Sequence, residues 1–345
     1  MKKNIVLLIV LFLLCVNVSG QDRVTLYYKY INKAELAICD FKYEKASNYY
    51  EKAFKTGLCF KNDLRNAFIV DYKYTEKEDN ILAYTYRLAQ RGFSTPAIDT
   101  VKYSKLYAQI KQVQDTTQII YDPAILKQLD TLLMVDQSYR KNGFAYKKEN
   151  RHVTDSLDLI NYNKWLSFYE IEDEAVKQTL GIYFDRTPVP LLRHNIVFGR
   201  FPANILWSQV QNGYLDVRDY MKIYDIYIGT AGTPQQRAMY AKIPFGGGTI
   251  VNKTFFGLYT KKDAPKLRKA FYLNSPKDEL KKHIYQFYHG EKEFFLVPIK
   301  IYGDPCSEED ELELRLQYKE FEKNNPEEYN KYEYIILTNP GFECE

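Results

Sequence analysis

Polar residues of the central chain fall where helical periodicity calls for apolar side chains. Asp136 and Arg140 continue a stripe of leucines by steps of three and four. Asp158 and Asn161 lie one turn apart on a later apolar stripe that includes Ile160 and Trp165. A carboxylate and a guanidinium on a buried stripe must pair, because an unpaired buried charge is strongly destabilising. Their i, i+4 spacing, acid first, suits a helical ion pair. We therefore expect a buried polar centre.

This polar centre has two interpretations. In the structural one, Asp136 and Arg140 form an ion pair that fixes helix packing, and Asn161 hydrogen-bonds to it. In the functional one, Asp136, Asp158 and His194 line a pocket in which His194 acts as a general base oriented by an acid. Arg140 would then hold an anionic group of the substrate. A lone histidine is more often structural, which favours the first interpretation.

Two further residues join the candidate binding set. Gln137 follows Asp136 directly, and Asp225 lies at the edge of an apolar helical stripe. No cofactor or metal is expected, because the chain lacks His-Glu-x-x-His and zinc-ribbon cysteine spacing. The glycines at 246–248 lack the Lys-Ser/Thr of a phosphate loop, and no Gly-x-Ser-x-Gly elbow is found. Whether the protein is an enzyme therefore stays open.

The elements that position these residues are expected to be helices. Pro123 opens a long one, and Asp216 caps another. Pro188 and Pro190 are expected to flank a short extended piece before His194. The predicted helices of this part run over residues 97–113, 123–140, 155–169, 202–213 and 216–228.

Residues 22–92 are predicted to form four amphipathic helices in two hairpins. They resemble two degenerate tetratricopeptide-type repeats, whose helix pairs must stack to bury their apolar faces. Such stacked helices offer a concave surface for a peptide or protein partner. The small, large, small spacing of the second repeat helix is found at Ala46, Tyr50 and Ala53, and 36 residues later, less regularly, at Leu82, Tyr86 and Ala89.

The central segment from Val135 to Asp225 resembles an uncharacterised domain of many bacterial proteins. The domain is frequent in exported Bacteroidetes proteins that begin with tetratricopeptide-like helices. The resemblance implies a domain and no particular reaction. The matching residues are Asp136-Gln137-x-x-Arg140, Asp158-x-x-Asn161, Gly181, His194 and the helix from Asn212-Gly213 to Asp225.

Residues 1–20 have the layout of a cleaved export signal. Two lysines precede an apolar run at 5–15, and a small-residue site follows at 18–20. The run is too short to span a bilayer, which needs roughly 20 residues. The protein is therefore expected to be exported, periplasmic or secreted. Lipoprotein anchoring through Cys15 is disfavoured, because Leu14 stands where a small residue is required.

Export permits disulfides among the four remaining cysteines. We expect a bridge between Cys306 and Cys344, because each closely follows the end of a predicted strand, at 294–302 and 334–338, in one βαβ unit. Pairing of Cys39 with Cys59 is disfavoured, since a helix of about 12 residues separates them by about 18 Å.

Composition and charge complete the sequence-based interpretation. Of 345 residues, 46% are hydrophobic, and the net charge of +4 falls to +2 without the two leader lysines, which argues against a nucleic-acid partner. We predict a mainly α protein that is most simply a non-catalytic protein- or peptide-binding or assembly protein. The alternative is a hydrolase-like enzyme using His194 with Asp136 or Asp158. The predicted units are a signal peptide (1–20), tetratricopeptide-like hairpins (21–95), a helical domain with the polar centre (96–230) and an α+β unit (231–345).

Overall fold

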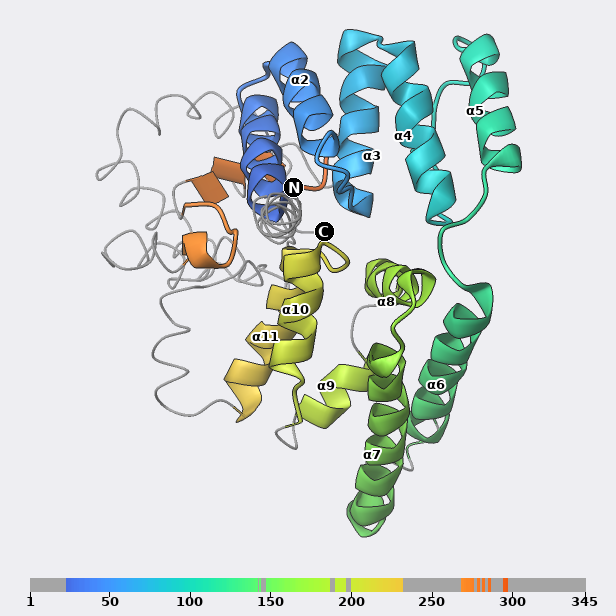
Figure 1. Ribbon diagram of the computed structural model, residues 1–345, viewed down its shortest axis with the longest axis vertical. Helices are drawn as coiled ribbons and strands as arrows, with labels where there is room; N and C mark the ends of the chain where they lie inside the picture. The colour runs from blue at the N-terminus through green and yellow to red at the C-terminus, as the bar shows by residue number, and fades with distance from the viewer. Residues whose placement is uncertain are drawn as a thin grey trace, which may run out of the picture.

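The computed structural model describes most of the chain between residues 23 and 231 and short pieces beyond (Figure 1). Helices dominate the described residues and none of them is in a strand, which confirms a mainly α protein. No described helix is both long and apolar enough to cross a membrane. The described ranges are 23–141, 143, 147–186, 190–196, 200–231, 268–275, 278–279, 281–282, 285–286 and 294–296.

The first helices stack side by side, each on its predecessor (Figure 1). Their inward faces carry small and aromatic residues that let neighbouring helices approach closely, as Ala46, Tyr50 and Ala53 do on α2. This part comprises a helix at residues 23–39, α2 (Tyr43–Phe54), α3 (Lys61–Val70), a π-helical turn (Asp71–Thr75), α4 (Glu78–Gln90) and α5 (Ser104–Thr116).

The buried residues of the second hairpin have the expected spacing, but they lie one residue earlier in the chain than predicted. Tyr86 is 48% exposed, whereas Ile81, Thr85 and Leu88 are buried, 35 rather than 36 residues after their counterparts in α2. The predicted set at Leu82, Tyr86 and Ala89 is therefore not the buried stripe. The tetratricopeptide assignment itself stays a prediction.

The middle of the chain forms a second group of helices. Asp122 precedes the first of them and accepts hydrogen bonds from the backbone N–H groups of Ala124 and Ile125, at 2.7 and 3.2 Å. Gly213, at φ 79°, ends another in the left-handed conformation that favours glycine. These helices are α6 (Pro123–Lys141), α7 (Arg151–Ser167), α8 (Glu174–Arg186), α9 (Pro190–Ile196), α10 (Ala203–Asn212) and α11 (Val217–Ala231).

Three local expectations are corrected. Residues 97–103 precede α5 without being part of it. Residues 190–193 belong to helix α9 rather than to an extended piece, because Pro190 suits the first position of a helix, and Pro188 lies outside the described residues. On α7, Ile160 of the predicted apolar stripe is 50% exposed, whereas Trp165 of the same stripe is buried, as are Asp158 and Asn161. The predicted stripe therefore marks the buried side of α7 except at Ile160.

One continuous hydrophobic core joins the described parts. It runs from Val24 in the first helix, through Trp165 and Met221, to Leu296. Residues 294–296 are not in a strand, and the rest of the strand expected at 294–302 lies outside the described residues. The predicted α+β character of the C-terminal unit is therefore untested.

Candidate functional site

Helices α6, α7 and α9 pack against one another and bring the predicted polar residues together (Figure 1). Asp136 and Arg140 lie on α6, Asp158 on α7 and His194 on α9. Asp136 is fully buried and Asp158 nearly so. The four residues form one site, which we call the α6–α7–α9 polar centre.

The guanidinium of Arg140 lies between two carboxylates. Its Nη1 donates to Asp136 Oδ1 at 2.9 Å and to the Asp136 carbonyl oxygen at 2.6 Å. Its Nη2 donates to the two oxygens of Asp158 at 2.6 and 2.8 Å. Burial alone would lower the pKa of Arg140, but these contacts with Asp158 and Asp136 raise it above its ordinary value. The ion pair expected from the i, i+4 spacing is therefore confirmed, and Asp158 extends it.

Asp136 is surrounded by donors from two helices. Gln137 Nε2 donates to its Oδ2 at 2.5 Å, and His194 Nδ1 lies 3.0 Å from Oδ2 and 3.2 Å from Oδ1. With Arg140 these residues account for both oxygens of the carboxylate. The side chain of His194 is 24% exposed, so its ring lies between the buried carboxylate and the surface. An acid that orients a histidine is present, as the functional interpretation required.

Tyr139 completes the polar centre and was missed by sequence reasoning. Its hydroxyl donates to Asp158 Oδ1 at 2.5 Å, and the Arg140 guanidinium lies 4.6 Å from the centre of its ring. Burial, together with the hydrogen bond to Asp158, raises the pKa of Tyr139 above its ordinary value. The position of Tyr139 between Gln137 and Arg140 could have indicated its role. Tyr139 does not, however, fall on the leucine stripe from which Asp136 and Arg140 were predicted.

Other predicted residues have different outcomes. Asn161 is buried beside the centre, yet its Nδ2 has no partner among the described residues, so the expected hydrogen bond to the ion pair is absent there. Asn195, which was not predicted, donates from Nδ2 to the Asp158 carbonyl oxygen at 3.2 Å. Asp225 belongs to α11, which packs on α9, but its side chain lies outside what the structure describes. Cys306 and Cys344 also lie outside the described residues.

The two described cysteines are free thiols. Cys39 and Cys59 are both buried and unbonded, in agreement with the expectation that they do not pair. Burial raises the pKa of the Cys39 thiol to about 12. A thiol held protonated in this way is a poor nucleophile, so Cys39 acts as a packing residue of the core and not as a reactive group.

Three groups of the polar centre have the chemistry of metal ligands. One ligand atom each from Asp136, Asp158 and His194 lie within 4.8 Å of one another. The Arg140 guanidinium, however, lies 2.6 to 2.9 Å from both carboxylates. A positive charge therefore already lies between the two acids, and a metal ion would have to displace it.

A second buried polar cluster was not predicted from the sequence. Arg218 on α11 donates to Asp216 at 2.6 Å, to Asp63 at 2.7 Å and to Glu35 at 3.3 Å. Lys282 donates to Glu35 at 2.5 Å. We call these five residues the Arg218 cluster. The prediction that Asp216 caps the following helix is confirmed, because its Oδ1 accepts from the Arg218 backbone N–H at 2.9 Å.

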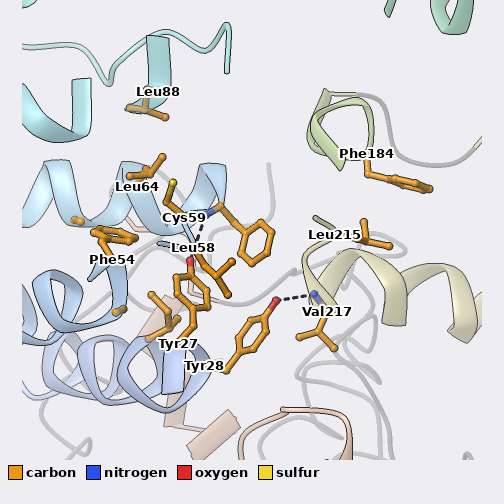
Figure 2. Close-up of a cluster of buried hydrophobic side chains, with 14 of the residues drawn as sticks. Tyr27, Tyr28, Phe54, Leu58, Cys59, Leu64, Leu88, Phe184, Leu215 and Val217 are labelled. Carbon is orange, nitrogen blue, oxygen red and sulfur yellow. Dashed lines mark hydrogen bonds between the residues drawn. The ribbon is translucent and has the colours of Figure 1, made fainter. Parts of the chain in front are cut away.

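Two tyrosines connect the Arg218 cluster to the first helix, and Figure 2 shows the contact of one of them, Tyr28, with Val217. The Tyr28 hydroxyl lies 2.8 Å from the backbone nitrogen of Val217, from which it accepts, and 3.1 Å from Asp216 Oδ1, to which it donates. The Tyr27 hydroxyl donates to Asp63 at 2.6 Å. Burial raises the pKa of both tyrosines well above the ordinary value, and the neighbouring carboxylates add to the effect. These hydroxyls therefore stay protonated and act as structural donors.

Comparison of the chain with protein-family models, with curated proteins and with solved structures found no match. The resemblance of residues 135–225 to an uncharacterised bacterial domain therefore stays a prediction. Functional assignment has to rest on the geometry of the chain itself.

Proposed function

We propose that the protein is a non-catalytic protein- or peptide-binding or assembly protein. The observation that supports this most is the saturation of the α6–α7–α9 polar centre. Arg140 uses both terminal nitrogens on Asp136 and Asp158, so its guanidinium is not available to hold an anionic substrate. Asp136 accepts from residues of α6 and contacts His194 of α9, which is the pattern of a group that fixes helix packing.

A binding surface suited to this role lies on the first helix and α2. Tyr30 and Tyr49 stack with ring centres 6.5 Å apart, and the ammonium groups of Lys33 and Lys52 each lie 5.6 Å from the centre of the Tyr49 ring. We call these four residues the tyrosine–lysine surface. Tyrosine is enriched at protein interfaces because its rigid ring combines apolar area with a polar tip. The surface therefore favours a protein partner.

Charge indicates which partner chemistry fits. Lys29 is exposed one turn before Lys33, and Lys45 is exposed on the Tyr49 side of α2. The nearby exposed Glu44 already contacts Lys77 at 3.5 Å. The surface is thus predominantly cationic, and an acidic, extended segment of a partner protein complements it.

The test is affinity capture with the full chain, compared with the charge-reversal variant Lys33→Glu/Lys52→Glu. We expect the variant to lose the partners that the unmodified protein retains, because reversed charge repels an acidic segment. Lys105→Glu, at an exposed position of α5, is the matched control and should retain them. Identical partners in all three samples would exclude this surface.

We also propose that the protein is exported and acts in the periplasm or outside the cell. The support is the lysine, apolar and small-residue layout of residues 1–20. Mass spectrometry of protein recovered from its native host should give a mature N-terminus at Gln21. An N-terminus that retains residues 1–20 would contradict the proposal.

A hydrolase-like enzyme is the second candidate, favoured by the contact of His194 Nδ1 with Asp136 at 3.0 Å. The opposite nitrogen of this partly exposed ring is the group that would take a proton from water or a hydroxyl. Turnover of a panel of ester and peptide substrates should then fall at least a hundredfold in His194→Ala and persist in His152→Ala, an exposed histidine of α7. Equal turnover in the two variants would eliminate this candidate.

A further inference from the structure

A groove of about 500 Å³ lies between the end of α7, the start of α8 and one face of α10. Its volume falls within the range of roughly 300–1,000 Å³ typical of small-molecule sites. All of its lining residues are described. It is separate from the tyrosine–lysine surface, which lies on the first helix and α2, and its residues are not those of the α6–α7–α9 polar centre.

One wall of the groove is a row of amide and hydroxyl side chains. Asn204, Ser208 and Asn212 follow one another at i, i+4 and i+8 on α10, so they lie on one face of the helix. All three are exposed, and Ile205 adds an apolar contact beside them. An amide offers both donors and an acceptor, and a hydroxyl offers one of each. This row therefore matches a ligand whose own groups both donate and accept.

Two residues of the lining carry buried polar atoms without partners. The Tyr169 hydroxyl and Gln209 Oε1 are buried, and neither has a hydrogen-bond partner among the described residues. Both residues line the groove. A buried polar atom that lacks a partner is destabilising, and one placed beside a groove gains most from a ligand that supplies the missing hydrogen bond.

The charges of the groove are already balanced. Lys177 donates to Glu172 at 2.5 Å, so the two charged lining residues neutralise each other. The Tyr214 hydroxyl donates to Glu174 at 2.5 Å, which also engages this acid. An ionic ligand would find no uncompensated opposite charge in the lining. A neutral ligand fits better.

We propose that this groove, which we call the α8–α10 groove, binds a neutral, hydroxyl-rich ligand of the carbohydrate class. Sugar hydroxyls donate and accept at once, as the amide and hydroxyl row on α10 requires. The ring of Tyr169 and the side chain of Ile205 offer apolar area to the C–H face of a pyranose. Rotation of the Tyr169 and Gln209 side chains on binding brings their buried polar atoms within hydrogen-bonding reach of the ligand, which supplies the partners that they lack.

The proposal makes Tyr169→Phe an informative variant. Without a ligand, removal of a hydroxyl that has no partner should leave the melting temperature unchanged or raise it. With a ligand, the same change removes a hydrogen bond and should weaken binding roughly tenfold. A tyrosine with a purely structural role would show the opposite pattern, with lower stability and unchanged binding.

The experiment is calorimetric titration of the full chain with glucose, galactose, N-acetylglucosamine and their β-linked disaccharides. We expect saturable binding of at least one sugar, weakened roughly tenfold by Tyr169→Phe and by Gln209→Leu. Asn163→Ala, at an exposed position of α7, is the control and should bind like the unmodified protein. Binding of none of these sugars, or equal binding by all variants, would overturn the proposal. So would preferential binding of glucuronate over glucose, because it would show that the groove selects charge.

Discussion

Asp136 and Arg140 show how a charged pair is accommodated inside the molecule at the scale of single residues. Each member satisfies several hydrogen-bonding positions of the other, and Asp158 and His194 occupy the remainder. Removal of Arg140 leaves Asp136 and Asp158 buried without their cation, and this is more destabilising than the absence of the whole set would be. The polar centre is therefore sensitive to single substitutions.

Asp136→Asn should lower the free energy of unfolding by about 1–3 kcal/mol, because Arg140 keeps its pair with Asp158 while Gln137 and His194 lose the carboxylate that they contact. Urea unfolding followed by circular dichroism measures the change. Asp130→Asn, at an exposed position of the same helix, is the matched control and should change stability by less than about 0.5 kcal/mol. A loss below about 1 kcal/mol in Asp136→Asn would show that the carboxylate does not hold α6 to its neighbours.

Glu35 gives the protein a predictable pH dependence. Burial raises its pKa from 4.5 to about 7, although the charges of Lys282 and Arg218 oppose the shift. The folded protein therefore holds a proton that the unfolded chain releases, and stability falls as pH rises from 4.5 through about 7. In Glu35→Gln this side chain cannot titrate. Between about pH 5 and 8, the free energy of unfolding should therefore fall more in the unmodified protein than in this variant.

Thermal unfolding at a series of pH values measures this difference. Glu78→Gln, at an exposed position of α4, serves as the control and should follow the unmodified protein. If the Glu35→Gln and unmodified curves remain parallel over this range, the carboxyl of Glu35 does not titrate there.

At the scale of elements, helix α8 packs on the segment after α10 through a glycine. A Cβ built at Gly181 would lie 2.0 Å from the carbonyl oxygen of Tyr214. Only a glycine permits this approach, because the backbone of residue 214 would have to move to admit a methyl group. This contact sets the separation of α8 and the α10–α11 turn, which also borders the α8–α10 groove.

Gly181→Ala should therefore destabilise the protein by about 1–3 kcal/mol, although alanine favours helix formation. Differential scanning calorimetry should show a lower melting temperature than for the unmodified protein. Gln178→Ala, one turn earlier on α8, lacks the clash and provides the comparison. An unchanged or higher melting temperature in Gly181→Ala would mean that residue 214 shifts freely.

The helix boundaries show which elements the sequence can predict. Local signals such as Pro123 and Gly213 bound α6 and α10 correctly, because caps and stop residues act through their immediate neighbours. The register of the second hairpin and the inward position of Ile160 on α7 were wrong. Both depend on which neighbouring helix packs against the residue in question. Ile160 remains exposed although it falls on the apolar stripe of its helix. The short α9 was missed because a proline can either precede a turn or begin a helix.

The same limit applies to the two polar clusters. Asp136 and Arg140 are four residues apart, so their pairing follows from helical geometry alone. Arg218 and Asp63 are 155 residues apart, and no spacing rule connects them. The functional interpretation of the sequence predicted that Asp158 and His194 share one pocket with Asp136. Tyr139, Asn195 and the whole Arg218 cluster required the tertiary structure.

At the scale of the whole molecule, the Arg218 cluster unites parts that the sequence suggested as separate units. It joins Glu35 of the first helix, Asp63 of α3, Asp216 and Arg218 at the start of α11, and Lys282 of the C-terminal part. Three carboxylates share two cations there. The described N-terminal helices therefore do not have a complete core of their own.

Arg218→Met should lower the free energy of unfolding by about 3–5 kcal/mol, because it leaves Asp63 and Asp216 without their cation. Hydrogen exchange followed by mass spectrometry should show faster exchange both in residues 23–39 and in α11. Arg91→Met, at a partly exposed position after α4, is the comparison. Faster exchange confined to α11 would indicate that the first helices fold independently of the cluster.

The separation of the Arg218 cluster along the chain also has a consequence during synthesis. Glu35 and Asp63 leave the ribosome 183 and 155 residues before Arg218, which is about 8–37 s at about 5–20 residues per second. Lys282 follows later still. Throughout that interval the two acids have no native cation to pair with, so the first helices remain incompletely folded. The export proposed above requires a chain that can thread through a translocation channel, and the late arrival of Arg218 would favour such a state until most of the protein has emerged.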